Sequence, residues 1–187
     1  MPARWPWVER TFCFDFPVGK FPDILSRFRG TPARIEEFAS SVAADQLTWR
    51  DAPGTWSIQE NIGHLLDLEA LWARRVEDFL RGEDRLSPAD INNPATHAAN
   101  HNARPIAELL GAFRAARGRL VARLEALDQT DWAREAIHPR LNQKLRLVDA
   151  IAFTCDHDDY HLARAAELAV RARGGFRGPG SGIRVPE

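Results

Sequence analysis

The sequence predicts an all-α protein built as a four-helix bundle. Three long segments carry apolar side chains at the three- and four-residue spacing of helices with a buried face; these are residues 58–80, 105–127 and 145–171. A fourth and shorter segment of the same kind follows Thr31 and Pro32. Helices of this length bury their apolar faces most simply against one another, in a bundle.

Length and composition are those of an ordinary folded protein. The chain has 187 residues, 44% apolar and 27% charged, which suffices for one domain, residues 1–187, with a substantial core. The formal charge of -1 provides no general attraction to nucleic acid or to anionic lipid, so neither partner is expected. No apolar run approaches the roughly 20 residues that a membrane span needs, and the first residues lack the apolar stretch of a signal peptide. We therefore expect a soluble protein.

The two cysteines, Cys13 and Cys155, lie far apart in the sequence and do not form a CxxC pair. This spacing indicates neither a disulfide framework nor a thiolate zinc site. A reducing cytoplasm is therefore the expected location.

The two ends of the chain lack helical periodicity. Residues 1–20 form an N-terminal arm in which Phe12, Phe14 and Phe16 alternate as in a strand without a partner. We expect this arm to pack along the body of the protein or on another subunit. Residues 174–187 form a C-terminal tail whose glycines and prolines exclude a continued helix, so we expect it to be flexible or to lie over a neighbour. Its arginines are expected to be solvated, with contact to an anionic partner as the alternative.

The first bundle helix is expected to begin at Thr31. A short helical turn between Pro22 and Arg29 precedes it, and Gly30 should end that turn because glycine often terminates helices. Thr31 followed by Pro32 then has the pattern of an N-cap and a first helical residue.

The second bundle helix is expected to run from about Ile58 to Leu80. Ser57 and Glu60 have the spacing of a capping box at its start. His64 lies among the apolar residues of this helix, so its side chain should be at least partly buried. A single histidine on such a face is more often a hydrogen-bonded core residue than a metal ligand.

Two connections are too long to be simple turns. Residues 81–104 contain His97 and His101 among alanines and asparagines. We expect these to be exposed loop histidines, with a contact of one of them to the functional site as the alternative. Residues 128–144 contain His138, which lies beside a proline and is expected to be solvated. These connections should supply most of the wall of a pocket.

The last helix carries the clearest indication of chemistry, in the segment CDHDDYHLAR. His157 and His161 are four residues apart, so in a helix they are rotated by only about 40° and separated by about 6 Å along the axis. Their face continues through apolar residues on both sides, namely Ala150, Phe153, Ala165 and Leu168. The two imidazoles should therefore point inward and offer half of a metal site. The alternative is a buried pair that bonds to nearby aspartates.

His64, His157 and His161 together offer three nitrogen ligands from two helices of one bundle, where metal sites are commonly built. Three neutral imidazoles suit zinc, nickel, iron or manganese, and a fourth position would be left for water or substrate. An ion bound in this way favours the deprotonated form of a water molecule or of a substrate thiol.

Nearby carboxylates could orient the histidine rings. Asp67 follows His64 by about one helical turn, and Asp156 and Asp158 flank His157. Asp67 is in addition a candidate catalytic residue, as a general base.

Two segments resemble the signatures of the DinB-like (DinB/YfiT-like) superfamily of metalloenzymes. WSIQENIGHLLDLE resembles the WSxxExxxHL segment that opens the second helix in that family, and CDHDDYHLAR resembles its HxxxH on the final helix. The resemblance also takes in residues 14–34 and the segment HPRLNQKLRLVDAIAF, and so covers most of the chain. Close relatives often read EHDDHH at the last signature, where this chain has Asp156 and Tyr160.

The resemblance implies an up-down-down-up bundle and a divalent metal held by His64, His157 and His161, with zinc or nickel ahead of iron or manganese. It also implies a thiol S-transferase or a hydrolase that acts on a small substrate, such as a low-molecular-weight thiol, and a homodimer. The alternative is a noncatalytic stress-response or scaffold bundle that retains a vestigial metal site.

Overall fold

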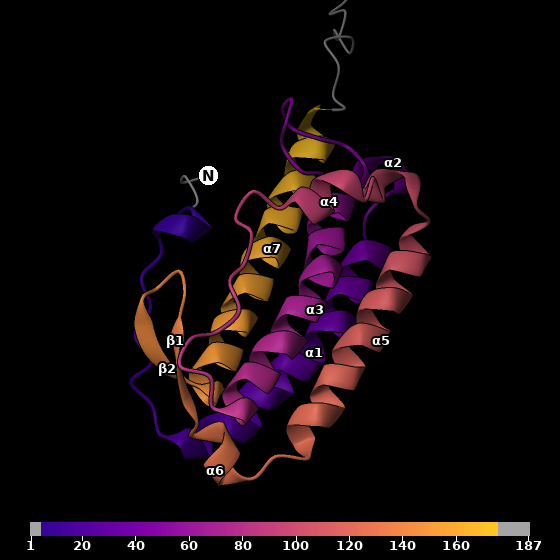
Figure 1. Ribbon diagram of the computed structural model, residues 1–187. Coiled ribbons are helices and arrows are strands. Elements are labelled where there is room, and N and C mark those ends of the chain that lie inside the picture. Colours follow the sequence, from indigo (N-terminus) through magenta and orange to yellow (C-terminus); the bar gives the residue numbers. More distant parts are fainter. Residues whose placement is uncertain (1–4, 176–187) are drawn as a thin grey trace, which may run out of the picture.

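The computed structural model describes residues 5–175, which form a bundle of four long helices (Figure 1). These are α1 (Phe21–Ser40), α3 (Ile58–Arg81), α5 (Ile106–Glu125) and α7 (Leu147–Gly175). Shorter elements are α2 (Ala44–Leu47), α4 (Pro94–Ala98), α6 (Gln129–Trp132) and 3-10 turns at Trp7–Glu9, Val18–Lys20 and His101–Ala103. The predicted all-α bundle is confirmed. Residues 1–4 and 176–187, which include most of the predicted C-terminal tail, lie outside the described residues.

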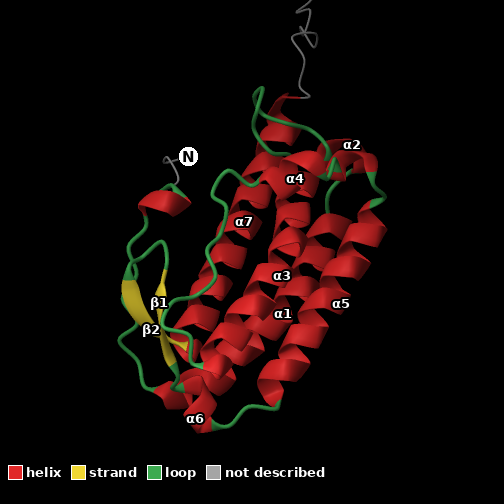
Figure 2. Ribbon diagram, viewed as in Figure 1, coloured by secondary structure: helices red, strands yellow, loops and turns green. Residues whose placement is uncertain are grey.

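The bundle has the up-down-down-up topology. α1 packs against α5 and α7, and α3 packs against the same two helices, so α1 and α3 lie on a diagonal. α1 and α7 run in one direction and α3 and α5 in the other (Figure 1). Because α3 and α5 are parallel, the chain must return along the bundle between them, which explains the length of residues 82–105 (Figure 2). None of the described helices combines the length and the apolar character needed to cross a membrane.

A two-stranded antiparallel hairpin lies in the connection from α5 to α7 (Figure 2). Its strands are β1 (Glu135–His138) and β2 (Gln143–Arg146), and Asn142 between them adopts a φ of 50°, which asparagine tolerates better than most residues. The sequence predicted only a connection here, because strands of four residues carry too little pattern to be recognised. The hairpin brings residues 138–140 to the side of the bundle where the histidines of α7 lie.

The N-terminal arm packs along the body of the protein, which is one of the two arrangements expected from the sequence. Trp7, Phe12, Phe14 and Phe16 are partly buried against the apolar core. The guanidinium of Arg146 in β2 donates to the backbone carbonyl of Phe16 (2.9 Å). Side-chain burial and a backbone hydrogen bond therefore both hold the arm in place.

Helix α1 is continuous through Gly30, so the predicted break at that residue is wrong. Pro32 lies inside the helix and has no N–H to donate to the carbonyl oxygen of Phe28, four residues earlier. The guanidinium of Arg117, on α5, donates to this oxygen instead (3.1 Å). Thr31, predicted as an N-cap, is buried inside the helix, and its hydroxyl donates to a carboxylate of α7 (3.0 Å). Contacts with other helices thus replace the local bonds whose loss would end α1.

Helix α3 begins where the capping box predicts. The Ser57 hydroxyl accepts from the backbone N–H of Glu60 (3.1 Å), and the Glu60 carboxylate accepts from the backbone N–H of Ser57 (2.9 Å). The helix ends at Gly82, whose φ of 74° lies in the left-handed region that favours glycine. The prediction of a helix from about Ile58 to Leu80 is confirmed.

A layer of buried polar side chains crosses the middle of the bundle and separates two apolar clusters. One cluster includes Phe79 and Trp132, and the other includes Leu65 and Phe113. Each of the four bundle helices contributes one buried polar side chain to the layer between them: Thr31, Glu69, Arg117 and Asp158.

Arg117 is the centre of this layer. Its five N–H groups bond to Glu69 (closest approach 2.6 Å), to Asp158 (2.7 Å) and to the carbonyl of Phe28. The guanidinium carbon also lies 3.8 Å from the centre of the Phe28 ring. One cation therefore faces two buried carboxyl groups, and burial raises the pKa of Glu69 to about 7, with Asp158 adding to the effect.

The free energy of unfolding should therefore fall as the pH rises through the range in which Glu69 ionises. The Glu69 pKa is about 7 in the folded protein against an ordinary value of 4.5, so the folded state holds this proton more tightly than the unfolded state does. The resulting stabilisation is complete below pH 4.5 and is lost as the pH rises towards 7 and above. The Glu69→Gln variant has no carboxyl group that ionises at this position, so its free energy of unfolding should not fall for this reason. Its stability relative to the wild type should rise by about 2 to 3 kcal/mol between pH 5 and pH 8, measured by urea unfolding.

The control for the loss of one negative charge is Glu77→Gln, which removes an exposed carboxylate of the same helix that pairs with Arg123 (2.8 Å). If the difference between Glu69→Gln and wild type is the same at both pH values, the Glu69 carboxyl does not hold a proton in the folded protein.

Candidate metal centre and its cavity

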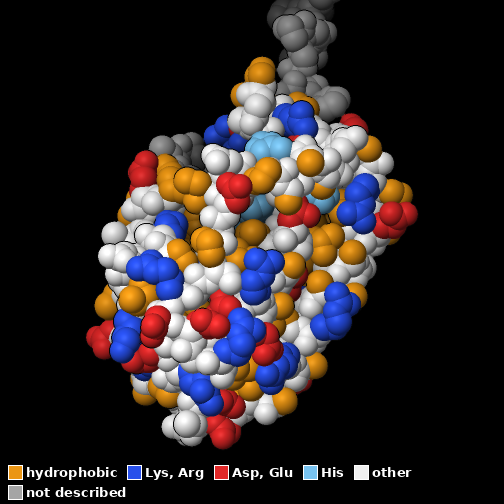
Figure 3. Space-filling model, in the orientation of Figure 1, with side chains coloured by type: hydrophobic (Ala, Val, Ile, Leu, Met, Phe, Trp, Pro, Cys, Tyr) orange, Lys and Arg blue, Asp and Glu red, His pale blue; other side chains and the backbone are white. Residues whose placement is uncertain are grey.

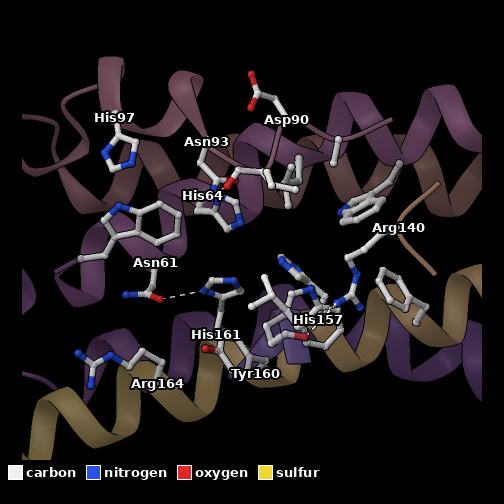
Figure 4. Close-up of a pocket in the computed structure, with 18 of the residues that line it drawn as sticks. Asn61, His64, Asp90, Asn93, His97, Arg140, His157, Tyr160, His161 and Arg164 are labelled. Atoms are coloured by element: carbon white, nitrogen blue, oxygen red, sulfur yellow. Dashed lines mark hydrogen bonds between the residues drawn. The ribbon is translucent and has the colours of Figure 1, made fainter. Parts of the chain in front are cut away.

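The three histidines predicted to bind a metal meet between α3 and α7. His64 comes from α3, and His157 and His161 come from successive turns of α7. One nitrogen of each ring lies within 4.8 Å of those of the other two. The ring centroid of His161 lies 4.7 Å from that of His64 and 4.6 Å from that of His157. All three are buried, with 3%, 5% and 7% of their surface exposed. Figure 4 shows the rings facing one another across a cavity between the two helices.

Helix α4 fixes the orientation of His64. Nδ1 of His64 lies 3.0 Å from the hydroxyl oxygen of Thr96, and this hydroxyl donates its one proton to the carboxylate of Asp67 (2.8 Å). The hydroxyl oxygen must then accept from His64, which places the ring proton on Nδ1 and leaves the lone pair on Nε2. Asp67 therefore orients His64 as predicted, but through Thr96 rather than by direct contact.

His101 is buried, so the prediction of an exposed loop histidine is wrong. Only 1% of it is exposed, and its Nε2 lies 2.9 Å from the same oxygen of Asp67. The ring lies directly on α3 at Gly63, where an added Cβ would lie 2.3 Å from it. Glycine at that position leaves the room that His101 needs. His97 is exposed, as predicted, with its ring centroid 5.7 Å from that of Trp56.

The other two histidines differ in their partners. The amide nitrogen of Asn61 donates to the carbonyl of Ser57 (2.7 Å), so its oxygen faces His161 and accepts from Nδ1 of that ring (2.8 Å). Nδ1 of His157 is buried, and no hydrogen-bond partner for it is found in residues 5–175. A buried nitrogen without a partner is uncommon in folded proteins. It fits a ring that binds a further group.

Burial keeps His64 and His157 neutral. It lowers the pKa of His64 to about 4, and it lowers the pKa of His157 well below its ordinary value, with His64, Arg140 and Arg117 adding to the effect. Neutral imidazole is the form that binds metals. The donor set, its spacing and its charge state therefore fit a divalent metal ion.

Asp156 and Asp158 do not bond to the histidine rings, so their predicted role as acceptors for those rings is wrong. Asp158 points into the bundle and pairs with Arg117 (2.7 Å), and Asp156 pairs with Arg27 of α1 (2.7 Å). Cys155 also points into the core, where burial raises the pKa of its thiol to about 12. These three side chains contact the neighbouring helices of α7 and do not contribute to the histidine site.

His138 is buried as well, and the prediction that it is solvated is wrong. Only 2% of it is exposed, its ring centroid lies 4.8 Å from that of Phe153, and a guanidinium nitrogen of Arg75 lies 3.0 Å from its Nε2. Burial lowers the pKa of His138 to about 3, and Arg75 and Arg140 add to the effect. This neutral ring joins the hairpin to α3.

The three histidines line a cavity of about 870 Å³. Its walls come from α3 and α7, from the two long connections as predicted, and also from the N-terminal arm and the segment before α3. Histidine side chains are visible from outside on the face shown in Figure 3, near the end of the bundle where α4 lies. The sequence did not single out Trp56, whose ring centroid lies 4.7 Å from that of His64, or Arg75 and Arg140. Trp56 is the first residue of the WSxxExxxHL signature and directly precedes the capping box, whereas Arg75 and Arg140 lie in neither of the two signature motifs.

The structure defines a class: an up-down-down-up four-helix bundle in which buried histidines of the second and fourth bundle helices form a site that could hold a divalent metal. The model of the DinB superfamily matches residues 27–165, which is most of the chain. The chain therefore belongs to the DinB superfamily, as the two sequence signatures predict.

Solved structures of other proteins share this fold. YfiT from Bacillus subtilis, described as a probable metal-dependent hydrolase with an unusual four-helix bundle topology, matches with a TM-score of 0.75 and 19% sequence identity, over 88% of this chain and 94% of its own. The mycothiol-dependent maleylpyruvate isomerase matches with a TM-score of 0.65 and 12% identity, over 87% of this chain and 70% of its own. At these identities the likeness shows the fold. Among curated proteins, no sequence matches the chain significantly.

Proposed function

We propose that this protein is a metal-dependent enzyme in which His64, His157 and His161 hold a divalent ion and the cavity binds a small substrate. The observation that carries the proposal is the meeting of three buried imidazoles inside a cavity that is large enough for a small molecule. Zinc or nickel suits this donor set best, with iron or manganese as alternatives. An ion held in this way would favour the deprotonated form of a water molecule or of a thiol, and the reaction would be hydrolysis or thiol transfer.

The chain's own groups would position the reactants. The side-chain oxygens of Thr96 and Asn61 each accept a hydrogen bond from a histidine Nδ1–H and so fix the rings. The aromatic side chains in the walls, which include Trp7, Trp56 and Trp72, make much of the cavity surface apolar. We propose Asp67 as a positioning residue rather than a general base, because its carboxylate accepts from Thr96 and does not line the cavity.

The descriptions of the two similar structures support the proposal of a metal-dependent enzyme. YfiT is described as a probable metal-dependent hydrolase, and the isomerase depends on the thiol mycothiol. Both descriptions agree with a bundle site that acts on small molecules. They leave hydrolysis and thiol transfer as the two reaction types to be tested here.

Metal analysis tests the proposal. Protein purified without a histidine tag should contain about one divalent ion per chain, and His157→Ala should lose most of it because a two-histidine site binds far more weakly. His97→Ala is the matched control: it removes an exposed histidine at the rim of the cavity and should keep the ion. Wild-type protein that remains free of metal after incubation with zinc, nickel, iron(II) and manganese salts would contradict the proposal.

Activity screening separates the enzyme from the alternative of a scaffold with a vestigial site. Metal-loaded protein should hydrolyse esters or amides, or conjugate a low-molecular-weight thiol to an electrophile, and metal removal should abolish this turnover. A scaffold would bind metal without turnover in either screen.

A further inference from the structure

The cavity carries arginines at its two ends, and only one end is neutralised. Figure 4 shows Arg164 and Arg140 at opposite ends, with the three histidines between them. Arg164 donates to both carboxylate oxygens of Asp51 (2.8 Å each). For Arg140, no carboxylate within ion-pair distance is found in the described part of the chain.

Arg140 is held in place but not neutralised. Its Nη1 donates to the backbone carbonyls of Trp7 (3.0 Å) and Val8 (3.3 Å) in the N-terminal arm. Its guanidinium carbon lies 5.2 to 5.5 Å from the ring centres of Trp7, Phe12 and Phe153. Nε and Nη2 are buried and have no hydrogen-bond partner within residues 5–175. Arg140 as a whole is half-buried, and a cation whose buried donors have no partner is costly unless an anion accompanies it.

Arg75 adds a second cation at the same end. Only 5% of it is exposed, and its Nε donates to the carbonyl of Ser87 (2.9 Å). The carboxylate of Asp78, one turn away on α3, instead accepts hydrogen bonds from Arg81 (2.7 Å) and from the backbone N–H of Ser87 (2.7 Å). No carboxylate pairs with Arg75 in the part of the chain that the structure describes. His138, between the two arginines in the cavity wall, is neutral and provides no compensating charge.

The acidic side chain of the cavity lining lies elsewhere. Among the lining residues, the carboxylate belongs to Asp90, which is exposed and accepts from the backbone N–H of Asn92 (3.0 Å). The end of the cavity at Arg75 and Arg140 is therefore positively charged, and the cavity walls are largely apolar, so an anion that reaches this end gains more than it would at the surface.

We propose that Arg75 and Arg140 form an anion-binding subsite and that the substrate of this protein is a small molecule with a carboxylate at one end. The Trp7 ring connects the subsite to the histidines, because its centroid lies 5.0 Å from that of His157 and 5.2 Å from the guanidinium carbon of Arg140. A substrate whose carboxylate meets the arginines thus places its adjoining carbon atoms beside the histidines. The reaction rests on the proposed function, whereas the binding of the carboxylate does not need the ion.

Fluorine NMR of three matched probes tests the subsite. The probes are para-fluorobenzoate, the uncharged para-fluorobenzamide and para-fluorophenyl phosphate. Wild-type protein should bind the benzoate at least tenfold more tightly than the amide. Arg140→Met should raise the benzoate Kd about tenfold to a hundredfold, because charge-assisted hydrogen bonds to the carboxylate are lost, and should leave amide binding unchanged. If the phosphate binds more tightly than the benzoate, the anionic group of the substrate is a phosphate and not a carboxylate. That result would overturn this part of the proposal.

Two controls separate the subsite from folding and from general charge. Arg123→Gln removes an exposed arginine of α5 that pairs with Glu77, and should leave benzoate binding unchanged. Arg140→Lys keeps the charge and should retain part of the binding. Arg140→Met should fold, since it removes a half-buried charge that lies among aromatic rings, and circular dichroism and its melting temperature check this. If it nevertheless fails to fold, benzoate and amide binding are compared between the wild type and the variants Arg140→Lys and Arg75→Met.

Metal content separates this proposal from the proposed function. Arg140→Met should keep the metal content of the wild type, and metal-free wild type should still prefer the benzoate over the amide. If the preference disappears on metal removal and survives in Arg140→Met, the carboxylate binds the ion and the arginine subsite is wrong. A protein that binds no metal but keeps an arginine-dependent preference would contradict the proposed function alone.

Discussion

Replacing Arg117 by alanine should lower the free energy of unfolding by about 3 to 5 kcal/mol, the effect expected when one partner of a buried ion pair is removed. Glu69 and Asp158 would lose the cation that lies between them, and both are buried to 5% exposure or less. The Phe28 carbonyl, which Pro32 cannot satisfy, would also lose its donor. Urea unfolding at neutral pH followed by circular dichroism measures the change.

The matched control is Arg123→Ala on the same helix. Arg123 is exposed and pairs with Glu77, so its loss should cost less than about 1 kcal/mol. The triple variant with Arg117→Met, Glu69→Gln and Asp158→Asn should recover much of the stability, because it removes the uncompensated charges together with their partner. A single Arg117→Ala variant as stable as Arg123→Ala would show that the polar layer does not hold the bundle together.

Replacing Thr96 by valine should weaken metal binding at the proposed centre about tenfold to a hundredfold, as expected when the hydrogen-bond partner of a ligand is lost. The hydroxyl of Thr96 is the acceptor for Nδ1 of His64, and without it the ring loses both its fixed proton position and its orientation. Valine keeps the shape of the side chain, so packing should change little. Isothermal titration with zinc, on protein stripped of metal, measures the affinity.

Thr96→Ser is the matched control, since it retains the hydroxyl and should bind zinc nearly as well as the wild type. Asp67→Asn separates the two roles considered for that residue. A positioning residue affects zinc affinity, whereas a general base would leave affinity unchanged and lower only the turnover. Equal zinc affinity in Thr96→Val and wild type would exclude the proposed path from Asp67 through Thr96 to His64.

The sequence predicts the fold well where side-chain periodicity is long. The capping box at Ser57 and the apolar pattern after it locate α3, and the pattern around His157 locates α7. Prediction fails at Gly30 and Pro32, because local rules stop a helix there while a guanidinium from α5 supplies the missing bond. That bond joins residues 89 positions apart. Propensity alone contains no information about it.

The candidate site is predicted in part for the same reason. His64, His157 and His161 belong to long helices whose apolar faces determine where they point. His101 and His138 lie in connections, and their burial depends on how those connections return to α3 and α7. The loops also supply Trp56 and Arg140, so the binding surface for a substrate emerges only in three dimensions.

The proline inside α1 has a consequence for how the chain assembles. We expect an isolated peptide with the sequence of α1 to lack a continuous helix, because nothing within it can replace the bond that Pro32 lacks. The straight form depends on a donor that arrives only when α5 docks, and the same guanidinium joins α3 and α7. We therefore expect all four helices to reach their final form together, rather than one pair before the other.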